Sequence, residues 1–241
     1  MNETTPPTGR LKQHLHADPL LWTLWLSIRR TFTKIKSACL GLLFGAARLY
    51  LGPGCRIHGA RFVRFGSNLY AQGHLWMEAI NTYNDQHFLP DIEIGHHVSF
   101  SERVHITCIE KIRIGNGVLV GSGVYIGDHH HGAYRGSQQS HPDTPPIHRP
   151  LAGGGPVIIQ DNVWIGDNVV IVGPVTIGRG SIIGANSVVR GDIPDRTIAA
   201  GAPARAIKKF NDATGQWERI REDDPDITPV LPAGKHKDAR G

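Results

Sequence analysis

Residues 159–194 read IQDNVW-IGDNVV-IVGPVT-IGRGSI-IGANSV-VRGDIP, six consecutive blocks that each open with Ile or Val. This spacing fits neither an α-helix, with a period of about 3.6 residues, nor a plain strand, with a period of about two. A chain that returns an aliphatic side chain to one face every six residues winds into a solenoid, whose stacked turns bury these openers together. We expect three six-residue blocks to form the three sides of each turn, which gives a triangular all-β coil. Small Val or Ser residues should face inward near its corners.

The same register can be followed towards the N-terminus. The apolar residues that open its blocks are Leu51, Ile57 and Val63, then Ile94, Phe100 and Ile106, then Ile114, Val120 and Ile126. Phe65 restarts the pattern with a shift of two residues, and an eight-residue step separates Ile106 from Ile114. Residues 72–91 are irregular, so we expect a looser coil or a small protrusion there. The repeats therefore predict a solenoid over residues 51–210, although a solenoid alone would also suit an inert scaffold.

The register stops for 33 residues between Ile126 and Ile159, and this interruption is the main candidate for a functional segment. Residues 127–155 read GDHHHGAYRGSQQSHPDTPPIHRPLAGGG, which is rich in Pro, Gly, Ser and His. Such a composition is typical of a loop, and a long loop inside a compact domain usually has a function. We therefore expect a long loop that interrupts the coils and carries three consecutive histidines near its start.

The composition of the 241 residues argues against several classes of protein. The 29 glycines and the low aromatic content favour a β fold with many corners over a helical bundle. The three cysteines, Cys39, Cys55 and Cys108, form no CxxC pair, which favours a reducing compartment over a disulfide framework. The net charge of +5 is too diffuse to indicate nucleic-acid binding. Residues 211–241 are charged and rich in proline, so we expect a mobile tail there.

Residues 18–50 contain apolar side chains at the three-or-four spacing of one helix face. They are Leu21, Leu24, Trp25, Ile28, Phe32, Ile35, Cys39, Leu42 and Leu43. The basic residues that interrupt this stretch are Arg29, Arg30, Lys34 and Lys36. They leave no uncharged run near the roughly 20 residues that span a membrane. We expect residues 1–50 to form a polar N-terminus and a basic amphipathic helix, without a secretory signal. The apolar face lies either in a membrane interface or against the solenoid or a neighbouring subunit.

The repeats, followed by AAGAPARAI at residues 199–207, resemble the left-handed β-helix hexapeptide-repeat acyltransferases. Residues 112–132, IRIGNGVLVGSGVYIGDHHHG, resemble the branch that O-acetylates sugars of lipopolysaccharide O-antigen, capsule or exopolysaccharide. The resemblance covers about residues 51–210 and implies a left-handed parallel β-helix. It also implies a homotrimer that binds acetyl-CoA in a cleft between neighbouring subunits.

The resemblance further implies roles for individual residues. The catalytic histidine of the family is the first His after the Ile-x-Asp corner, and here that residue is His129. The positions that match acetyl-CoA contacts are Trp164 beside the cofactor cleft, Ala185 along the pantetheine, and Arg205 and Lys208 at the nucleotide phosphates. Many relatives carry Thr-Lys where this chain has Arg190 and Gly191, so one phosphate contact is expected to move to Arg190. A serine common in relatives is replaced here by Asp167.

Acetyl transfer from a thioester requires a base that takes the proton of the acceptor hydroxyl and a donor that stabilises the oxyanion. An imidazole, with a pKa of about 6.5, suits this role, and His129 is expected to act directly in a ternary complex. Asp128 is adjacent, but neighbouring side chains usually diverge, so it need not be the partner of this histidine. Asp128 and His131 are expected to orient the loop or the acceptor, and His105 and Asn84 are candidate acceptor contacts.

Adjacent histidines rarely point at one ion, and no His-x4-His pair lies near the loop, so no metal is expected. Cys108 is a weaker candidate for a nucleophile. The sequence therefore predicts a cytoplasmic homotrimeric O-acetyltransferase that uses acetyl-CoA and modifies a sugar hydroxyl of a cell-envelope or secreted polysaccharide. A lipid-linked acceptor at the inner face of the membrane would suit the basic helix. The alternatives are N-acetylation of an amino sugar or nucleotide sugar, a metal-dependent lyase of the carbonic-anhydrase type, and a non-catalytic trimeric scaffold.

Overall fold

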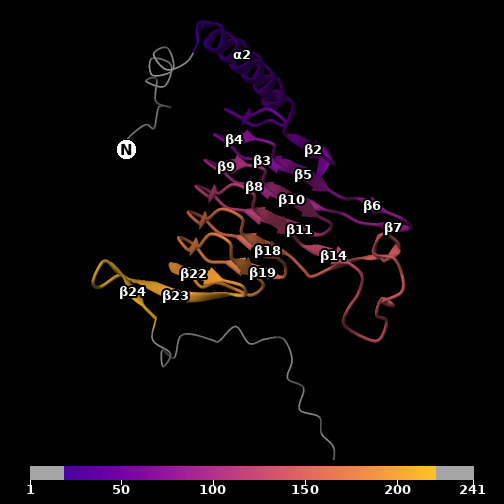
Figure 1. Ribbon diagram of the computed structural model, residues 1–241. Helices are drawn as coiled ribbons and strands as arrows, with labels where there is room; N and C mark the ends of the chain where they lie inside the picture. Colours follow the sequence, from indigo (N-terminus) through magenta and orange to yellow (C-terminus); the bar gives the residue numbers. More distant parts are fainter. Residues whose placement is uncertain (1–18, 221–241) are drawn as a thin grey trace, which may run out of the picture.

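The computed structural model describes residues 19–220, in which short strands wind into a three-sided coil (Figure 1). Side 1 contains, in spatial order, β1 (Tyr50–Leu51), β4 (Tyr70–Gly73), β9 (Ser99–Glu102), β12 (Leu119–Val120), β17 (Trp164–Ile165), β20 (Ile182–Ile183), β22 (Thr197–Gly201), β23 (Ala204–Asn211) and β24 (Gln216–Arg219). Side 2 contains β2 (Arg56–His58), β5 (Trp76–Ala79), β10 (His105–Cys108), β13 (Tyr125–Gly127), β18 (Val170–Val172) and β21 (Val188–Val189). Side 3 contains β19 (Val175–Ile177), β16 (Val157–Ile159), β11 (Lys111–Ile114), β8 (Asp91–Ile94) and β3 (Val63–Phe65).

The hydrophobic core runs through the middle of the coil, as the six-residue period predicts. Parallel pairing places Ile106 beside Ile126, and Ile126 beside Ile171, and all three side chains are fully buried. The inward Val and Ser residues near the corners are also buried, among them Val169 and Ser187. Each coil therefore buries its aliphatic side chains against the coils above and below, and the predicted parallel β-helix is confirmed.

We expect Ile171→Ala to lower the free energy of unfolding by about 2–5 kcal/mol, because the side chain is fully buried between Ile126 and Val189 and its loss leaves a cavity. Denaturant unfolding followed by circular dichroism measures the change. Ile158→Ala is the matched control, since this side chain is only half-buried on side 3. Equal losses in the two variants would contradict a core that runs along the coil axis.

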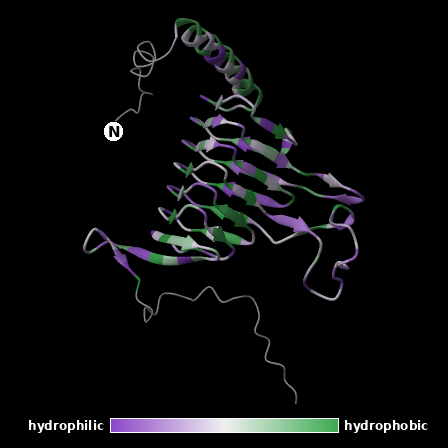
Figure 2. Cartoon of the chain, viewed as in Figure 1, coloured by the Kyte–Doolittle hydropathy of each residue, from purple (hydrophilic) through white to green (hydrophobic). Residues whose placement is uncertain are grey.

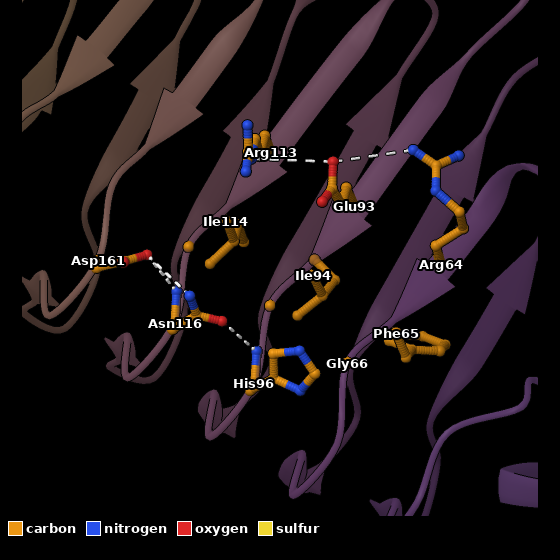
Figure 3. Close-up of a pocket in the computed structure, with 12 residues that line it drawn as sticks. Arg64, Phe65, Gly66, Glu93, Ile94, His96, Arg113, Ile114, Asn116 and Asp161 are labelled. Atoms are coloured by element: carbon orange, nitrogen blue, oxygen red, sulfur yellow. Dashed lines mark hydrogen bonds and ion pairs between the residues drawn. The ribbon is translucent and has the colours of Figure 1, made fainter.

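The corner between side 3 and side 1 is held by hydrogen bonds that repeat from coil to coil. The backbone N–H of His96 donates to Asn116 Oδ1 at 2.8 Å, and the backbone N–H of Asn116 donates to Asp161 Oδ1 at 2.7 Å. Figure 3 shows these side chains beside a groove of about 400 Å³, where arginine side chains flank Glu93 on the outer face. The polar corner residues therefore accept hydrogen bonds from the backbone of the preceding coil, which keeps this edge regular.

Where two successive inward residues are more than six residues apart, the chain between them crosses the corner between side 2 and side 3. These longer steps run from Ile57 to Phe65, from Met77 to Ile94, from Ile106 to Ile114 and from Ile126 to Ile159, and η1 (Ala60–Phe62) lies in the first. The irregularity expected over residues 72–91 is wrong for 72–79, because β4 and β5 keep the register. Residues 80–90 form the protrusion, a hairpin of β6 (Thr82–Tyr83) and β7 (Gln86–His87).

The long loop also leaves the coil at this corner, and it has structure of its own. Strands β14 (His129–His131) and β15 (Leu151–Gly153) pair antiparallel at its base, and the 3-10 turn η2 (Pro146–His148) lies between them. We call residues 128–156 the arm. The arm and the β6–β7 hairpin project on the same side of the coil (Figure 1).

The predicted helix is confirmed as α2 (Leu20–Leu43), which lies at the N-terminal end of the coil stack (Figure 1). The backbone N–H of Leu51 donates to Ser37 Oγ at 3.0 Å, and a Cβ on Gly41 would approach Ala46 O to 2.8 Å. The helix therefore contacts the first coil through small residues, and the alternative in which its apolar face packs on its own solenoid is wrong. Within residues 19–220, no helix is long and apolar enough to cross a membrane.

The expected mobile tail is wrong for residues 211–220. There the chain turns back as β24, which pairs antiparallel with β23 and brings the Phe210 and Trp217 rings within 5.4 Å of each other. Bulky aromatic residues at paired positions give this hairpin an apolar contact that the charged composition concealed. The rest of the expected tail, 221–241, and the polar segment 1–18 lie outside the described residues.

Candidate active site

Asp128 is fully buried at the corner between side 2 and side 3, where the chain leaves the coil. Its carboxylate accepts hydrogen bonds from the backbone N–H groups of Ile109, Glu110 and Lys111, at 2.9, 2.8 and 2.9 Å. These three residues turn the corner of the preceding coil. Burial alone would raise the pKa of Asp128, but the hydrogen bonds from His129 and from this backbone outweigh it and lower the pKa below its usual value. The carboxylate is therefore ionised at neutral pH.

The same carboxylate holds the ring of His129, so the expectation that the two side chains diverge is wrong. His129 Nδ1 lies 2.9 Å from Asp128 Oδ1, because the chain bends at Asp128 before β14 begins. An ionised carboxylate can only accept, so Nδ1 carries the hydrogen and the lone pair of the neutral ring is on Nε2. Nε2 faces Thr107 Oγ1 at 3.5 Å, and the His129 side chain is 7% exposed. The ring is thus oriented and in the tautomer that a general base requires.

Cys108 lies on the other side of Asp128 and is not suited to be a nucleophile. Its S–H group faces Asp128 Oδ2 at 3.2 Å, and the side chain is fully buried. Burial, and then the negative charge of Asp128, raise the pKa of this thiol far above its usual range. The thiol therefore stays protonated, and a reaction through a cysteine thiolate is disfavoured.

An aromatic row runs along the outer face of side 2 and ends beside His129. We define it as Trp76, His105 and Tyr125, which occupy paired positions on β5, β10 and β13. The Trp76 and His105 rings stack at 4.1 Å, and Tyr125 meets His105 edge-on at 5.4 Å. Within residues 19–220, Trp76 Nε1 is buried without a hydrogen-bond partner. His105, which was expected near the acceptor, therefore lies on β10, the same strand as Thr107, whose hydroxyl group faces His129.

Burial shifts the pKa values of the two ionisable residues in the aromatic row. Burial lowers the pKa of His105, although Glu78, whose Oε2 lies 3.5 Å from His105 Nε2, opposes this. Burial, and then the negative charges of Asp128 and Glu78, raise the pKa of Tyr125. The Tyr125 ring lies over Gly127, where an added Cβ would approach its hydroxyl oxygen to 2.5 Å. The row therefore consists of packed rings with two charged groups beside them, the Arg56 guanidinium 5.1 Å from the Trp76 ring and the Glu78 carboxylate. Its last hydroxyl group, that of Tyr125, points along the strand towards Gly127.

The β6–β7 hairpin braces the arm. Tyr83 Oη donates to Ile147 O at 2.6 Å and lies 3.3 Å from His131 Nδ1, while Gln86 exchanges two hydrogen bonds with the backbone of Leu151. His131 is exposed and contacts Tyr83, so its side chain does not join the Asp128–His129 pair. Asn84 occupies the exposed turn of the hairpin with φ 49°. These contacts fix the loop that carries His129.

The residues expected to contact acetyl-CoA lie elsewhere on the coil. Trp164 is exposed on side 1, where it is followed in register by Ile182, Ile198 and then Lys208. The others are Ala185 at the corner between sides 1 and 2, Arg190 just after β21, and Arg205 on β23. Within one chain, the structure thus brings His129 together with Asp128 but leaves Trp164 and Lys208 on another side. Among residues 19–220, no three His, Cys, Asp or Glu side chains gather to hold a metal ion.

Reasoning from the sequence missed Thr107, Trp76 and Tyr125. Tyr125 and His105 each precede an inward isoleucine, so alignment of the register would have placed them side by side. Trp76 escaped because residues 72–79 did not read as regular repeats. The role of Asp128 had no signal in the sequence, since it depends on a bend and on backbone groups of another coil.

A family model described as "Bacterial transferase hexapeptide (six repeats)" matches residues 156–191. The chain is 39% identical over 166 residues to the "Putative lipopolysaccharide biosynthesis O-acetyl transferase WbbJ" of Escherichia coli (strain K12), covering 68% of this chain and 81% of that protein. It is 36% identical over 129 residues to the galactoside O-acetyltransferase of the same strain, covering 51% of this chain and 56% of that protein.

Among solved structures, the fold is similar to that of AntD, an N-acyltransferase from Bacillus cereus that was crystallised with dTDP and 3-hydroxybutyryl-CoA. The TM-score is 0.55 at 18% sequence identity, and the match covers 70% of this chain and 84% of that chain. At this identity the likeness concerns the fold alone.

Proposed function

Because the chain belongs to the hexapeptide-repeat acetyltransferase family, we propose that it moves the acetyl group of acetyl-CoA to a sugar hydroxyl. Two similar proteins are named as O-acetyltransferases, one of lipopolysaccharide biosynthesis and one of galactosides, which supports an acceptor of this class. We place the acceptor in a cell-envelope or exported polysaccharide and the reaction in the cytoplasm. The observation that supports the proposal is the buried Asp128–His129 pair, which leaves the lone pair of the histidine ring on Nε2, beside Thr107 Oγ1.

In the proposed reaction, His129 Nε2 takes the proton of the acceptor hydroxyl as its oxygen attacks the thioester carbonyl carbon. The carbonyl becomes a tetrahedral oxyanion, which then expels the CoA thiolate, and the imidazolium returns the proton to that sulfur. Asp128 stabilises the imidazolium through Nδ1 and keeps the ring in place throughout. Both substrates are bound at once, so no acetylated enzyme is formed.

We assign the acceptor to the aromatic row beside His129. Sugar sites combine flat apolar surfaces with a few polar groups, and this row offers aromatic rings and the carboxylate of Glu78. His131 and Asn84 lie on the arm and on the hairpin that braces it, from which they can reach an acceptor that extends beyond the row. Their roles as acceptor contacts remain predictions.

Trp76→Ala is expected to raise the KM for the acceptor by roughly tenfold while the KM for acetyl-CoA stays near its wild-type value, because aromatic surface is lost from the acceptor side only. Steady-state kinetics with each substrate varied in turn gives both constants. Trp164→Ala is the matched control on side 1, and it is expected to raise the KM for acetyl-CoA instead. The assignment of the row fails if both variants shift the same constant.

We propose that the working enzyme is a homotrimer. His129 leaves the coil between sides 2 and 3, whereas Trp164 and Lys208 belong to side 1 of the same chain. A neighbouring subunit that offers its side 1 to this corner would complete the site. In that arrangement Trp164 and Ala185 would border the pantetheine of CoA. Its phosphates would be neutralised by Arg190, Arg205 and Lys208.

The experiment that tests the function is a screen of sugar acceptors with labelled acetyl-CoA. The panel should contain simple sugars, oligosaccharides, nucleotide sugars and amino sugars, so that oxygen and nitrogen acceptors compete directly. The proposal expects label in a base-labile ester on a sugar hydroxyl. If label appears only in a base-stable amide, the proposal of O-acetylation is wrong and the reaction is N-acetylation of an amino sugar.

A further inference from the structure

Helix α2 turns an apolar face away from the rest of the protein. We define this apolar face as Leu21, Leu24, Trp25, Ile28, Phe32, Ile35, Leu42 and Leu43. Leu21 is 79% exposed, Phe32 is 70% exposed and Leu42 is 86% exposed. Ten of the seventeen exposed large hydrophobic side chains between residues 19 and 220 belong to this one helix. Figure 2 shows hydrophobic residues along α2 outside the coil stack. An apolar surface of this extent marks an interaction site.

The opposite face of the helix accounts for its attachment to the coil. Ser37 and Gly41 are buried there, and Ser37 Oγ bonds to both backbone groups of Leu51. Because side chains four apart lie above one another on a helix, this contact fixes which face points outward. The apolar face is therefore held outward by the packing on the first coil, and the core does not need it.

The charges on α2 distinguish between the surfaces that could cover the apolar face. The helix has four basic residues and no acidic residue in its 24 positions. Trp22 and Trp25 stack at 4.8 Å near its start, and Arg29 lies 5.2 Å above the Trp25 ring. Tryptophan and arginine beside exposed leucines are typical of helices that lie in the interface of an anionic membrane.

We propose that α2 lies in the surface of a lipid bilayer that contains anionic lipids, with the apolar face among the acyl chains. Arg29, which lies beside Trp25, would then meet lipid phosphates, whereas Lys36 Nζ donates to Gly52 O of the first coil at 3.4 Å. The coils would extend away from the bilayer, since α2 is at one end of the stack (Figure 1). A second copy of the helix fits less well, because it would bring basic side chains together with no acidic residue on the helix to pair with them. This inference does not rest on the proposed reaction.

The test is flotation of the full chain with vesicles of phosphatidylcholine and phosphatidylglycerol, compared with phosphatidylcholine alone. The wild type is expected to float with the anionic vesicles and to dissociate partly at high salt, where charges are screened. The double variant Ile28→Ser with Phe32→Ser is expected to bind at least about tenfold more weakly, because two apolar side chains no longer reach the acyl chains. Leu89→Ser is the matched control, since Leu89 is 86% exposed outside the helix.

Circular dichroism and light scattering complete the test. The double variant should keep the wild-type helix signal, unfolding midpoint and oligomeric mass, so that its loss of binding reports the membrane contact alone. If the wild type does not float with anionic vesicles, or if the double variant floats equally well, the proposal is wrong. It is also wrong if the double variant forms a smaller oligomer, because a second copy would then be the occupant.

Discussion

His129→Ala is expected to lower kcat by about 10²- to 10⁴-fold while the dissociation constant of acetyl-CoA stays within about twofold of the wild-type value. His129 Nδ1 lies 2.9 Å from Asp128 Oδ1, at the corner where the chain leaves side 2, whereas we assign the cofactor contacts to residues on side 1 of the neighbouring subunit. Loss of the His129 side chain therefore removes the base without removing a contact to acetyl-CoA. Single-turnover transfer of labelled acetyl groups gives the rate, and calorimetry gives the binding constant.

His130→Ala is the matched control, because the next residue on β14 is also a histidine but its side chain is exposed and lies beside the Tyr134 ring at 5.6 Å. This variant should retain most of the wild-type kcat. Near-normal turnover by His129→Ala would rule out the assignment of the base. Equal losses in both variants would point instead to a role of β14 in shaping the arm.

The coil could be predicted from the sequence because its cause is local and repeated. Ile159, Ile171 and Ile183 recur at the same position of every block, and each is buried against its equivalent in the next coil. A period sustained over many turns leaves few other ways to bury these side chains. The same local signal predicted that α2 is a helix, since its apolar residues keep a helical spacing.

What could not be predicted depends on contacts between distant residues. The Asp128–His129 pair forms because Ile109, Glu110 and Lys111 present backbone N–H groups that hold the carboxylate, some eighteen residues before it in sequence. The outward apolar face of α2 depends on the choice of Ser37 and Gly41 as the packing surface. Sequence periodicity identifies two faces of a helix, but it does not say which one the protein buries.

The corner between sides 2 and 3 explains why the site is built where it is. The other two corners keep six-residue steps between inward side chains, and a corner residue of one coil can accept from the backbone of the preceding coil, as Asp161 does from Asn116. At this corner the coil gains the hairpin and the arm, so successive turns no longer match and backbone N–H groups need another acceptor. Asp128 fills that need, and in doing so it places a buried negative charge beside His129. The irregularity in the fold and the chemistry of the site thus have one origin.

Asp128→Asn is expected to lower kcat by about 10²- to 10⁴-fold although His129 itself is unchanged. An amide cannot stabilise the imidazolium by charge, and if its NH₂ group faces the ring, Nδ1 must accept and the hydrogen moves to Nε2. The ring is then in the wrong tautomer to take a proton. Kinetics should show the loss in kcat rather than in the KM for acetyl-CoA.

A structural loss must be separated from a chemical one, since the Asp128 carboxylate also accepts three backbone hydrogen bonds. We expect Asp128→Asn to lower the free energy of unfolding by about 1–3 kcal/mol at neutral pH. The folded-state pKa of Asp128 is below its unfolded value of about 3.9, so its stabilising effect is present above that pH and is lost as the pH falls through the folded-state pKa. The stability difference between wild type and variant should therefore shrink below about pH 4.

Asp161→Asn is the matched control, because Asp161 also accepts a backbone N–H at a corner, at 2.7 Å, but within residues 19–220 its carboxylate pairs with Asn116 and with no histidine. It should change stability modestly and leave kcat near the wild-type value. If Asp161→Asn lowered kcat as much as Asp128→Asn, the effect would come from loosening of the coil. If Asp128→Asn kept normal turnover, the carboxylate would serve only to accept backbone hydrogen bonds at the corner, and His129 would be oriented by other groups.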